Sequence, residues 1–217
     1  MGSVNRHVSR SMRPGVGTRR PGRETRQRIV NATRELLMKK GYAQFSMRNV
    51  AAHAGLHLGN VQYYFPTRDD LVQALLTDTG ARYRAAYDNL LATAPADRIA
   101  RFKTVIEFNL RDIATMETRR FFIQLWALLS TLDGDSGTLL NELYRIDIQQ
   151  LSDCIADLDP AADPAQIRRR ATLLAALIEG LVVVRSAHSR SAIEIKRLMA
   201  HAHKMGMQIS LGGVGEV

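Results

Sequence analysis

Residues 46–65 constrain the fold of this chain more than any other segment, because their apolar positions fit two short helices joined by a tight turn. These apolar positions are Val50, Ala51, Ala54, Leu56, Val61 and Tyr64. Ser46 stands where an N-cap residue accepts a hydrogen bond from the first turn, and Gly55 stands where a left-handed backbone is needed. The pattern predicts a helix pair whose second member, exposed on one flank, is suited to enter the DNA major groove.

Positive charge is concentrated around this helix pair. The chain has 30 Lys and Arg against 21 Asp and Glu, a net charge of +9. Residues 1–68 hold 13 of the basic residues but only Glu24 and Glu35 of the acidic ones, so this part carries +11 and the remainder carries −2. Such an asymmetry favours contact with a polyphosphate. For residues 1–22 alone, a terminus that only increases solubility is an equal alternative.

The remaining composition predicts a cytoplasmic protein. Cys154 is alone, so no internal disulfide can form, and a small buried side chain is favoured over a reactive thiol. The longest apolar stretch, residues 173–184, includes Glu179 and is too short to span a bilayer. The N-terminal arginines are not followed by an apolar core, so no secretory signal is expected.

The chain outside the pair carries helical rather than alternating periodicity, which predicts an all-α fold. The expected helices span residues 23–40, 67–91, 97–115, 118–132, 136–158, 164–187 and 190–208. Thr67 and Asp70 predict a capping box at the start of the helix 67–91. Three regions follow: a disordered basic arm at 1–22, a three-helix head at 23–66, and a helical body at 67–210. The helix 67–91 links the head to the body.

The predicted helix 164–187 is apolar around much of its circumference, so it must be covered on more than one side. Its small residues Ala171, Ala175, Ala176 and Gly180 share one side. Packing against the helix 136–158, and against the same two helices of a second copy, would cover it as a four-helix bundle. The alternative is the central core helix of a monomer.

These segments resemble the TetR family of regulators. Over residues 25–76 the resemblance rests on Phe45-Ser-Met-Arg-Asn-Val-Ala through Ala54-Gly-Leu and on Tyr63-Tyr-Phe-Pro-Thr-Arg-Asp-Asp-Leu. In the body, Arg120-Phe-Phe-Ile-Gln-Leu-Trp-Ala-Leu and Ala176-Leu-Ile-Glu-Gly-Leu resemble BetI-type members more weakly. The resemblance implies an N-terminal helix-turn-helix domain at 23–66 and a C-terminal ligand-binding and dimerisation domain at 67–210. It also implies a homodimer that binds a palindromic operator, usually as a repressor, and is released by a small molecule.

Carried over by position, the resemblance also implies which residues contact DNA. They are Arg48, His57, Leu58, Gly59, Asn60, Gln62, Tyr63, Tyr64 and Arg68. The amides of Asn60 and Gln62 can pair with adenine, each for about 1–3 kcal/mol of discrimination. Arg48 suits guanine or phosphate, whereas the two tyrosines, His57 and Arg68 suit the sugar-phosphate backbone.

Three of these positions depart from the family pattern. His57, Leu58 and Gln62 replace residues that are common there, so the operator sequence is not carried over. Core packing is the alternative for Tyr64 and is favoured for Phe65. Arg19, Arg20 and Arg23 form an arm that either follows the DNA groove or stays free.

For the effector site, the sequence offers polar and aromatic residues inside apolar helical stretches. The candidates are Glu107, Arg111, Trp126, Tyr144, Glu179, Arg185 and His188. A pocket with a few convergent polar groups needs such residues, although each alone is more simply a core or interface residue. Trp126 with Glu107 would suit a cation. His201 and His203 have a metal-like spacing without a third ligand, so a solvated face is favoured and no metal or cofactor is predicted.

The sequence thus predicts a ligand-responsive DNA-binding regulator, most simply a repressor, and not an enzyme. No Ser/His/Asp set, Gly-rich phosphate loop or metal cluster stands out in it. The alternatives are a helical small-molecule-binding protein or enzyme whose head only localises it, and a nonspecific nucleoid-type DNA binder. The effector, the operator, the controlled genes and the choice between repression and activation are not encoded in these patterns.

Overall fold

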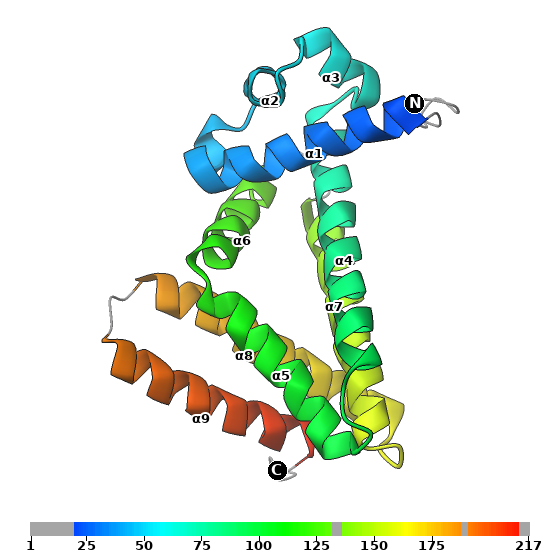
Figure 1. The fold of residues 1–217 in the computed structure, drawn as a ribbon, viewed down its shortest axis with the longest axis vertical. Helices are drawn as coiled ribbons and strands as arrows, with labels where there is room; N and C mark the ends of the chain where they lie inside the picture. The colour runs from blue at the N-terminus through cyan, green and yellow to red at the C-terminus, as the bar shows by residue number, and fades with distance from the viewer. Residues whose placement is uncertain (1–19, 132–135, 188–190, 213–217) are drawn as a thin grey trace, which may run out of the picture.

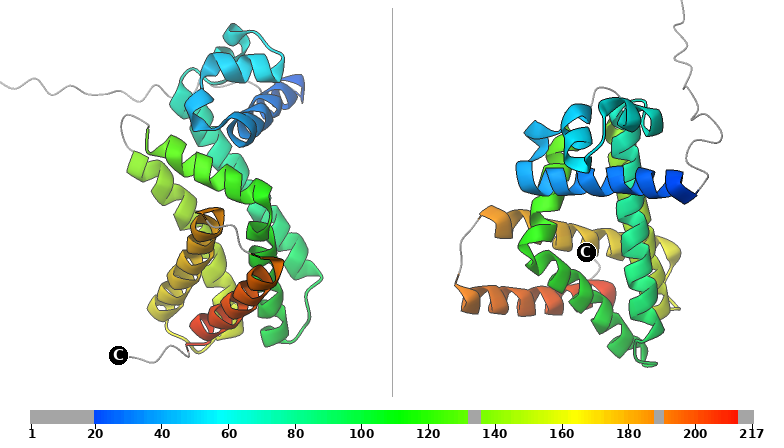
Figure 2. Two further views of the ribbon diagram at one scale, coloured as in Figure 1. Left: turned by 90° about the vertical axis from the view of Figure 1, so that its left-hand side faces the viewer. Right: turned by 45° about the horizontal axis from the view of Figure 1, so that its top comes forward.

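The computed structural model describes residues 20–131, 136–187 and 191–212, and within these ranges all regular elements are helical. The helices are α1 (Arg20–Lys40), the 3-10 turn η1 (Tyr42–Gln44), α2 (Met47–Ala54), α3 (Leu58–Tyr64), α4 (Arg68–Ala92), α5 (Arg98–Ala114), α6 (Met116–Leu129), α7 (Ser136–Leu158), α8 (Pro164–Ala187) and α9 (Ala192–Ser210). α1, α2 and α3 form a head at one end of the molecule, and the longer helices form a body beneath it (Figures 1 and 2). The predicted all-α architecture is confirmed.

The head folds around a small apolar core. Ile29 and Leu37 of α1 pack there with Val50 and Val61 from the helix pair, and all four are fully buried. Thr33 is also buried, and its hydroxyl donates to the carbonyl of Ile29 at 2.9 Å, so this buried hydroxyl is satisfied. Ile29, Thr33 and Leu37 recur at helical spacing, so they form the inward face of α1.

The turn of the helix pair has the predicted chemistry. The hydroxyl of Ser46 accepts from the backbone N–H of Asn49 at 3.1 Å and caps α2. Gly55 ends α2 in the left-handed region with φ 63°, where a Cβ would be strained. These two residues fix where α2 begins and ends and therefore where α3 emerges.

α4 connects the head to the body. It starts at a full capping box, in which Thr67 accepts from the N–H of Asp70 and the Asp70 carboxylate accepts from the N–H of Thr67. Its first turns bury Leu71 and Leu75 in the head, and its last turns bury Tyr87 in the body. α1 lies across α4 and α6, so both helices support the head from below (Figure 1).

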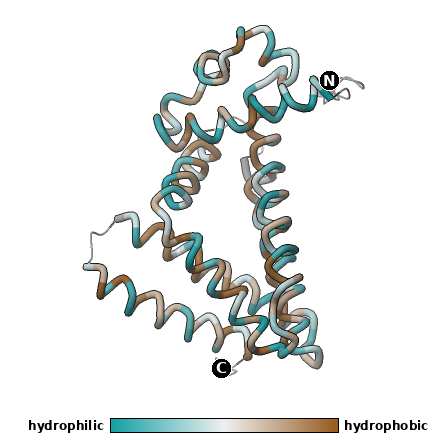
Figure 3. The backbone as a smooth tube through the Cα atoms, in the orientation of Figure 1, coloured by the Kyte–Doolittle hydropathy of each residue, from teal (hydrophilic) through white to brown (hydrophobic). Residues whose placement is uncertain are grey.

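The body is a layered bundle of α5 to α9 around the lower half of α4. α7 and α8 pack closely against each other through residues that include Leu151, Ile155, Ala171 and Leu174, all fully buried. Apolar and polar residues recur along the helices with helical period (Figure 3). No helix in the described ranges is long and apolar enough to cross a membrane.

Helix boundaries differ from the sequence expectations by a few residues. α1 begins at Arg20, three residues before the predicted start, because Pro21 and Gly22 fall in its first turn, where a missing N–H is tolerated. Most of the predicted disordered arm, residues 1–19, lies outside the described residues. η1, which joins α1 to α2, was not predicted from the sequence.

Candidate DNA interface and effector cavity

α3 presents a polar outer flank. Gly59, Asn60, Gln62 and Tyr63 are exposed, whereas Val61, on the opposite side of the helix, is fully buried. Leu58 and Tyr64 are half-buried and pack against the head core. The structure therefore leaves both predicted amide side chains accessible to solvent and gives Tyr64 a packing role.

Gly59 is a notable member of this flank. A Cβ built there would meet no atom within 4 Å, so no packing requirement inside the chain explains a glycine. Glycine within a helix is less stable than alanine by roughly 0.5–1 kcal/mol. A glycine at an open helical position suits the close approach of another molecule.

Other predicted DNA residues surround α3. Arg48 is exposed on α2, and His57 is the N-cap of α3 without a side-chain capping hydrogen bond. Tyr63 is 62% exposed and meets Tyr64 edge to face, with ring centroids 5.2 Å apart. These side chains are free to contact a surface that α3 approaches.

Arg68 differs from this pattern. Its guanidinium group lies over the ring of Phe45, 5.2 Å from the centroid, and donates to the Thr131 hydroxyl at 3.3 Å. In this conformation Arg68 joins η1, α4 and the end of α6 rather than extending into solvent. The sequence pattern did not reveal this because Phe45 and Thr131 are far from Arg68 along the chain.

The head is tied to α4 by a charged cluster around Asp78. This carboxylate accepts from Gln27 at 2.7 Å, from Arg34 at 3.1 Å and from Arg82 at 2.7 Å. Arg34 also donates to the Thr79 hydroxyl at 2.8 Å. The pKa of Asp78 is lowered, although burial opposes the shift, because these donors favour the ionised carboxylate.

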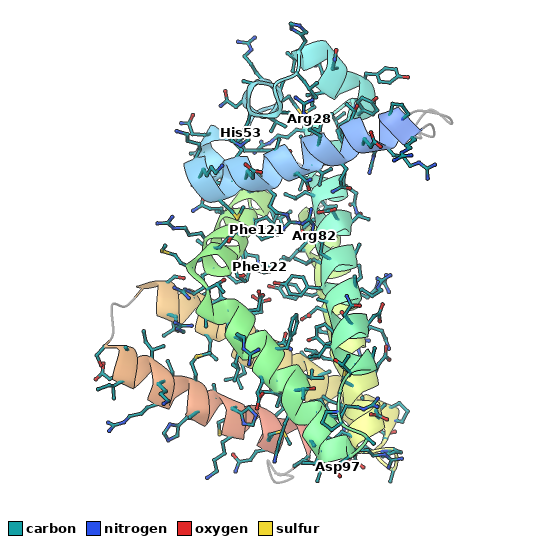
Figure 4. All side chains as sticks on the ribbon, viewed as in Figure 1. Arg28, His53, Arg82, Asp97, Phe121 and Phe122 are labelled. Atoms are coloured by element: carbon teal, nitrogen blue, oxygen red, sulfur yellow. The ribbon has the colours of Figure 1, made fainter. Side chains whose placement is uncertain are left out.

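A second tie runs to α6. The backbone N–H of Tyr42 donates to the side-chain carbonyl of Gln124 at 2.8 Å. Phe121 and Phe122 lie on the same helix below α1, and their rings meet at a centroid distance of 5.4 Å (Figure 4). The head thus rests on two helices, α4 and α6, that both continue into the body.

A partly enclosed cavity of about 60 Å³ lies among α4, α5, α6, α7 and α8. Its lining includes Tyr83, Asp112, Phe122, Tyr144, Asp147 and Glu179, and none of the described residues that line it is basic. Thr79, which accepts a hydrogen bond from Arg34 of the head, also lines the cavity, as does Gly80. Helix α4 therefore borders the cavity one residue away from Asp78. The cavity is therefore both acidic and adjacent to the helix that supports the head.

Two of the cavity carboxyl groups, those of Asp147 and Glu179, form no ion pair with a basic side chain in the part of the chain that the structure describes. Burial raises the pKa of Asp147 to about 6. Burial, and then the negative charge of Asp147, raise the pKa of Glu179 to about 8. The Oε2 atom of Glu179 is buried without a hydrogen-bond partner among the described residues. These two groups would be stabilised as carboxylates by a bound cation.

The third carboxyl group, Asp112, is already satisfied. It accepts from the Tyr83 hydroxyl at 2.6 Å and from the Thr118 hydroxyl at 3.0 Å. The pKa of Tyr83 is raised by burial and then by the negative charge of Asp112. Tyr83 thus contributes an aromatic wall whose hydroxyl is held in place.

Glu179 and Tyr144 also border an open groove on the outside of the bundle. Trp126, Leu140, Gly180 and Val183 complete much of its lining. The indole Nε1 of Trp126 is buried, and it lies near enough to the Tyr144 hydroxyl to oppose the rise in the pKa of that group, which burial causes. Three of the predicted effector residues, Trp126, Tyr144 and Glu179, therefore converge here.

The other predicted effector residues do not join them. Glu107 and Arg111 line a separate shallow hollow on α5 beside His203 of α9, so the expected pairing of Glu107 with Trp126 is not found. Arg185 donates from Nη1 to the carbonyl of Ile113 at 3.2 Å and so caps the end of α5. His188 lies outside the described residues.

The sequence analysis missed several polar residues of the cavity, among them Tyr83, Asp112 and Asp147, and for Asp147 a sequence signal existed. Asp147 follows Leu140 and Leu143 by seven and four positions and precedes Leu151 by four, so it interrupts an apolar helical stripe. A single carboxylate within an apolar helical stripe is the sequence feature that could have indicated a buried polar site at Asp147. By contrast, burial raises the pKa of Cys154 to about 12, which makes this thiol inert, as predicted.

The contacts of His201 and His203 do not indicate a metal site. The His201 ring contacts the carbonyl of Arg197 at 2.8 Å, and Nε2 of His203 lies 4.0 Å from Glu107. Among the described residues no group of three or more His, Cys, Asp or Glu side chains is arranged to hold a metal ion.

Comparison with known proteins gives a family match for the head. Residues 29–75 match the family model described as bacterial regulatory proteins, tetR family. The chain is 24% identical over 180 residues to the transcriptional regulator BetI of Burkholderia ambifaria, covering 82% of this chain and 90% of that protein. It is 26% identical over 158 residues to BetI of Burkholderia thailandensis, covering 72% and 78%.

Solved structures share the whole architecture. A transcriptional regulator from Saccharomonospora viridis in complex with choline superposes with a TM-score of 0.67 at 22% identity, over 84% of this chain and 95% of that chain. The reduced form of NemR from E. coli gives a TM-score of 0.66 at 19% identity, over 83% and 97%. At these identities the structures establish the fold.

Proposed function

Because this chain belongs to the TetR family of transcriptional regulators, we propose that it is a repressor that binds a palindromic operator as a homodimer and is released by a small-molecule effector. The observation that carries the proposal is the pairing of two features in one chain. α3 exposes two amide side chains, and an acidic cavity borders α4, the helix that supports the head. Its place of action is the cytoplasm, and its activity requires no catalytic step.

For DNA recognition, α3 enters the major groove with its outer flank. Asn60 and Gln62 read base edges, and Gly59 permits close approach. Arg48, His57 and Tyr63 contact the backbone from the sides of the helix. Arg68 acts through the structure of the head, since its guanidinium group is already stacked on Phe45.

For assembly, α8 carries an exposed apolar stripe that a second copy would cover. Leu173, Val183 and Val184 are 54%, 50% and 46% exposed, and Ala176 and Gly180 lie exposed between them. Large exposed apolar side chains at helical spacing fit a helix–helix interface. Together with α7, this stripe would form a four-helix bundle across a twofold axis and place two copies of α3 about 34 Å apart.

For release, an effector in the cavity would act on α4 and α6 together. Thr79 lines the cavity and bonds to Arg34 of α1, and Phe122 lines it beside Phe121. A ligand that displaces these two helices changes how α1 rests on them, and so changes the separation of the two α3 helices. The structurally similar regulator from Saccharomonospora viridis was solved in complex with choline, which supports a small-molecule effector for this chain.

The chain offers a direct test, because its single tryptophan, Trp126, borders the outer groove, which shares Tyr144 and Glu179 with the cavity. Small molecules that change tryptophan fluorescence would be added to a complex of the protein with labelled operator DNA, and anisotropy would report release. The proposal expects the same compounds to produce both signals. Binding that leaves operator affinity unchanged would refute release by effector, and equal affinity for unrelated DNA sequences would favour a nonspecific DNA binder.

A further inference from the structure

The cavity contains more negative charge than the described residues that line it compensate. Asp147 of α7 and Glu179 of α8 are both part of this lining, which includes no Lys, Arg or His among the described residues. Glu179 feels the charge of Asp147, so the two carboxyl groups are close enough to interact. The remaining carboxylate, Asp112, is satisfied by two hydroxyl groups. A ligand that compensated this charge would supply positive charge to two groups rather than one.

Hydrogen bonding restricts the ligand further. The Oε2 atom of Glu179 is fully enclosed and has no donor among the described residues. A buried acceptor without a partner is costly, and a charged N–H donor is the strongest partner for a carboxylate. A quaternary ammonium group carries charge but no N–H, so it would leave this oxygen unsatisfied.

The size and the walls of the cavity fit a short chain. A volume of about 60 Å³ corresponds to roughly four to six water-sized groups, since one water needs about 10–15 Å³ of this measure. Tyr83, Phe122 and Tyr144 supply aromatic walls, which attract cations and cover methylene groups. An unbranched alkyl chain with a charged group at each end satisfies these dimensions.

We propose that the cavity binds a compact organic dication with N–H donors at both ends, that is, a short aliphatic diamine. One ammonium group pairs with Asp147 and the other with Glu179, while the methylene chain lies against the aromatic rings. This inference rests on the proposed function, because it names the chemical class of the effector for the same site.

Binding of such a ligand is accompanied by proton release. With its pKa raised to about 8, Glu179 is largely protonated at neutral pH in the empty cavity. Other groups facing it are Asp147, Asp112, Tyr83 and Tyr144, which are acidic or neutral. A second ammonium group stabilises the Glu179 carboxylate, so the proton leaves as the diamine enters.

The test is isothermal titration of the full-length protein, without DNA, using matched probes. They are butane-1,4-diamine, butan-1-amine with one charge, the bis-trimethylammonium derivative of the diamine with no N–H, choline, and neutral butane-1,4-diol. The diamine should bind at least about tenfold more tightly than any other probe, because it alone satisfies both carboxylates. The titrations are repeated in buffers of different ionisation enthalpy, because the dependence of the binding enthalpy on the buffer gives the number of protons released. This number should be larger for the diamine than for butan-1-amine.

Substitutions test whether Asp147 and Glu179 cause the preference for the diamine. Asp147→Asn and Glu179→Gln should each reduce the advantage of the diamine over butan-1-amine to less than about threefold. Glu107→Gln, an exposed carboxylate of α5 outside the cavity, should leave it unchanged. Thermal unfolding of each variant separates lost binding from lost folding, because removal of a buried uncompensated carboxyl group should not lower the midpoint.

Equal or tighter binding of choline or of the bis-trimethylammonium compound would overturn the role of N–H donors. Equal binding of butan-1-amine would overturn the two-carboxylate account, and no binding of any amine would overturn the diamine class. These failures differ from failure of the proposed function. If the diamine binds but operator affinity does not change, the cavity assignment stands and release by effector fails.

Discussion

The guanidinium group of Arg34 lies over the ring of Phe121, 4.4 Å from its centroid. Arg34 belongs to the head, and Phe121 belongs to α6, whose next residue, Phe122, lines the acidic cavity. The same guanidinium group donates to Asp78 and to Thr79 of α4, and Thr79 also lines the cavity. Arg34 therefore contacts both helices that a cavity ligand would move.

Replacement of Arg34 should uncouple the head from the cavity. We expect Arg34→Met to lower the free energy of unfolding by about 1–3 kcal/mol, because it removes two charge-assisted hydrogen bonds and a cation–π contact. It should also reduce the effect of an effector on operator affinity while effector binding stays near the wild-type value. Chemical denaturation and anisotropy titrations measure the two effects.

Arg82→Met is the matched control for this change. Arg82 bonds to the same Asp78 carboxylate, but its side chain is 51% exposed against 16% for Arg34. Its loss should therefore change the free energy of unfolding by less than about 1 kcal/mol. Equal effects of the two substitutions would show that Arg34 has no special coupling role.

The stability of the protein should depend on pH through Glu179. Its folded-state pKa, about 8, exceeds the ordinary value, so the folded state binds the proton more tightly than the unfolded state. Below the unfolded-state pKa, Glu179 is protonated in both states and the folded state keeps its full stability. As the pH rises through the folded-state pKa, the buried carboxyl group ionises and this stability is lost. Glu179→Gln removes this dependence.

The variant and the wild type should therefore unfold at similar temperatures near pH 5 but differ at pH 9. There the Gln variant should be more stable by roughly 1–3 kcal/mol, after allowance for partial exposure of the side chain. Thermal scans at several pH values test this. A constant difference across the range would mean that Glu179 titrates normally.

Gly59 should show opposite effects on stability and on DNA binding. Gly59→Ala adds a Cβ that meets no atom of the protein, so α3 should become more stable by roughly 0.5–1 kcal/mol. If α3 approaches DNA closely there, operator affinity should fall by about tenfold, or roughly 1.4 kcal/mol. Unchanged affinity would place this face of α3 away from the DNA surface.

The stripe on α8 should control assembly. We expect Val183→Asp to shift the protein to a monomer in sedimentation experiments, because it introduces a charge into the proposed apolar interface. Ile193→Asp is the control: Ile193 is 66% exposed on α9, more than Val183 at 50%, but lies on another helix. Dissociation by the α9 variant instead would relocate the interface.

The positions of the helices were predictable because local chemistry determines them. The Ser46 cap, the left-handed Gly55 and the Thr67–Asp70 capping box all lie within a few residues of the helix ends that they determine. The start of α1 was predicted three residues too late, because Arg, Pro and Gly at 20–22 resemble the arm in composition although they form its first turn.

The cavity was only partly predictable, because it is formed by five helices whose relative rotations no single segment specifies. Glu107 and Glu179 each interrupt an apolar stretch, yet only Glu179 faces the cavity. Arg185 was predicted as an effector residue, but it bonds to a carbonyl 72 positions away. Such long-range partners are set by tertiary packing and leave no local pattern.

The most direct test of the account is selection of bound sequences from random duplex DNA by the purified full-length protein at physiological salt. We expect an enriched inverted repeat with half-sites about 34 Å apart, and loss of this motif when Asn60 and Gln62 are replaced by Ala while dimerisation is retained. Recovery of DNA without a common motif, by a protein that sediments as a monomer, would contradict the account.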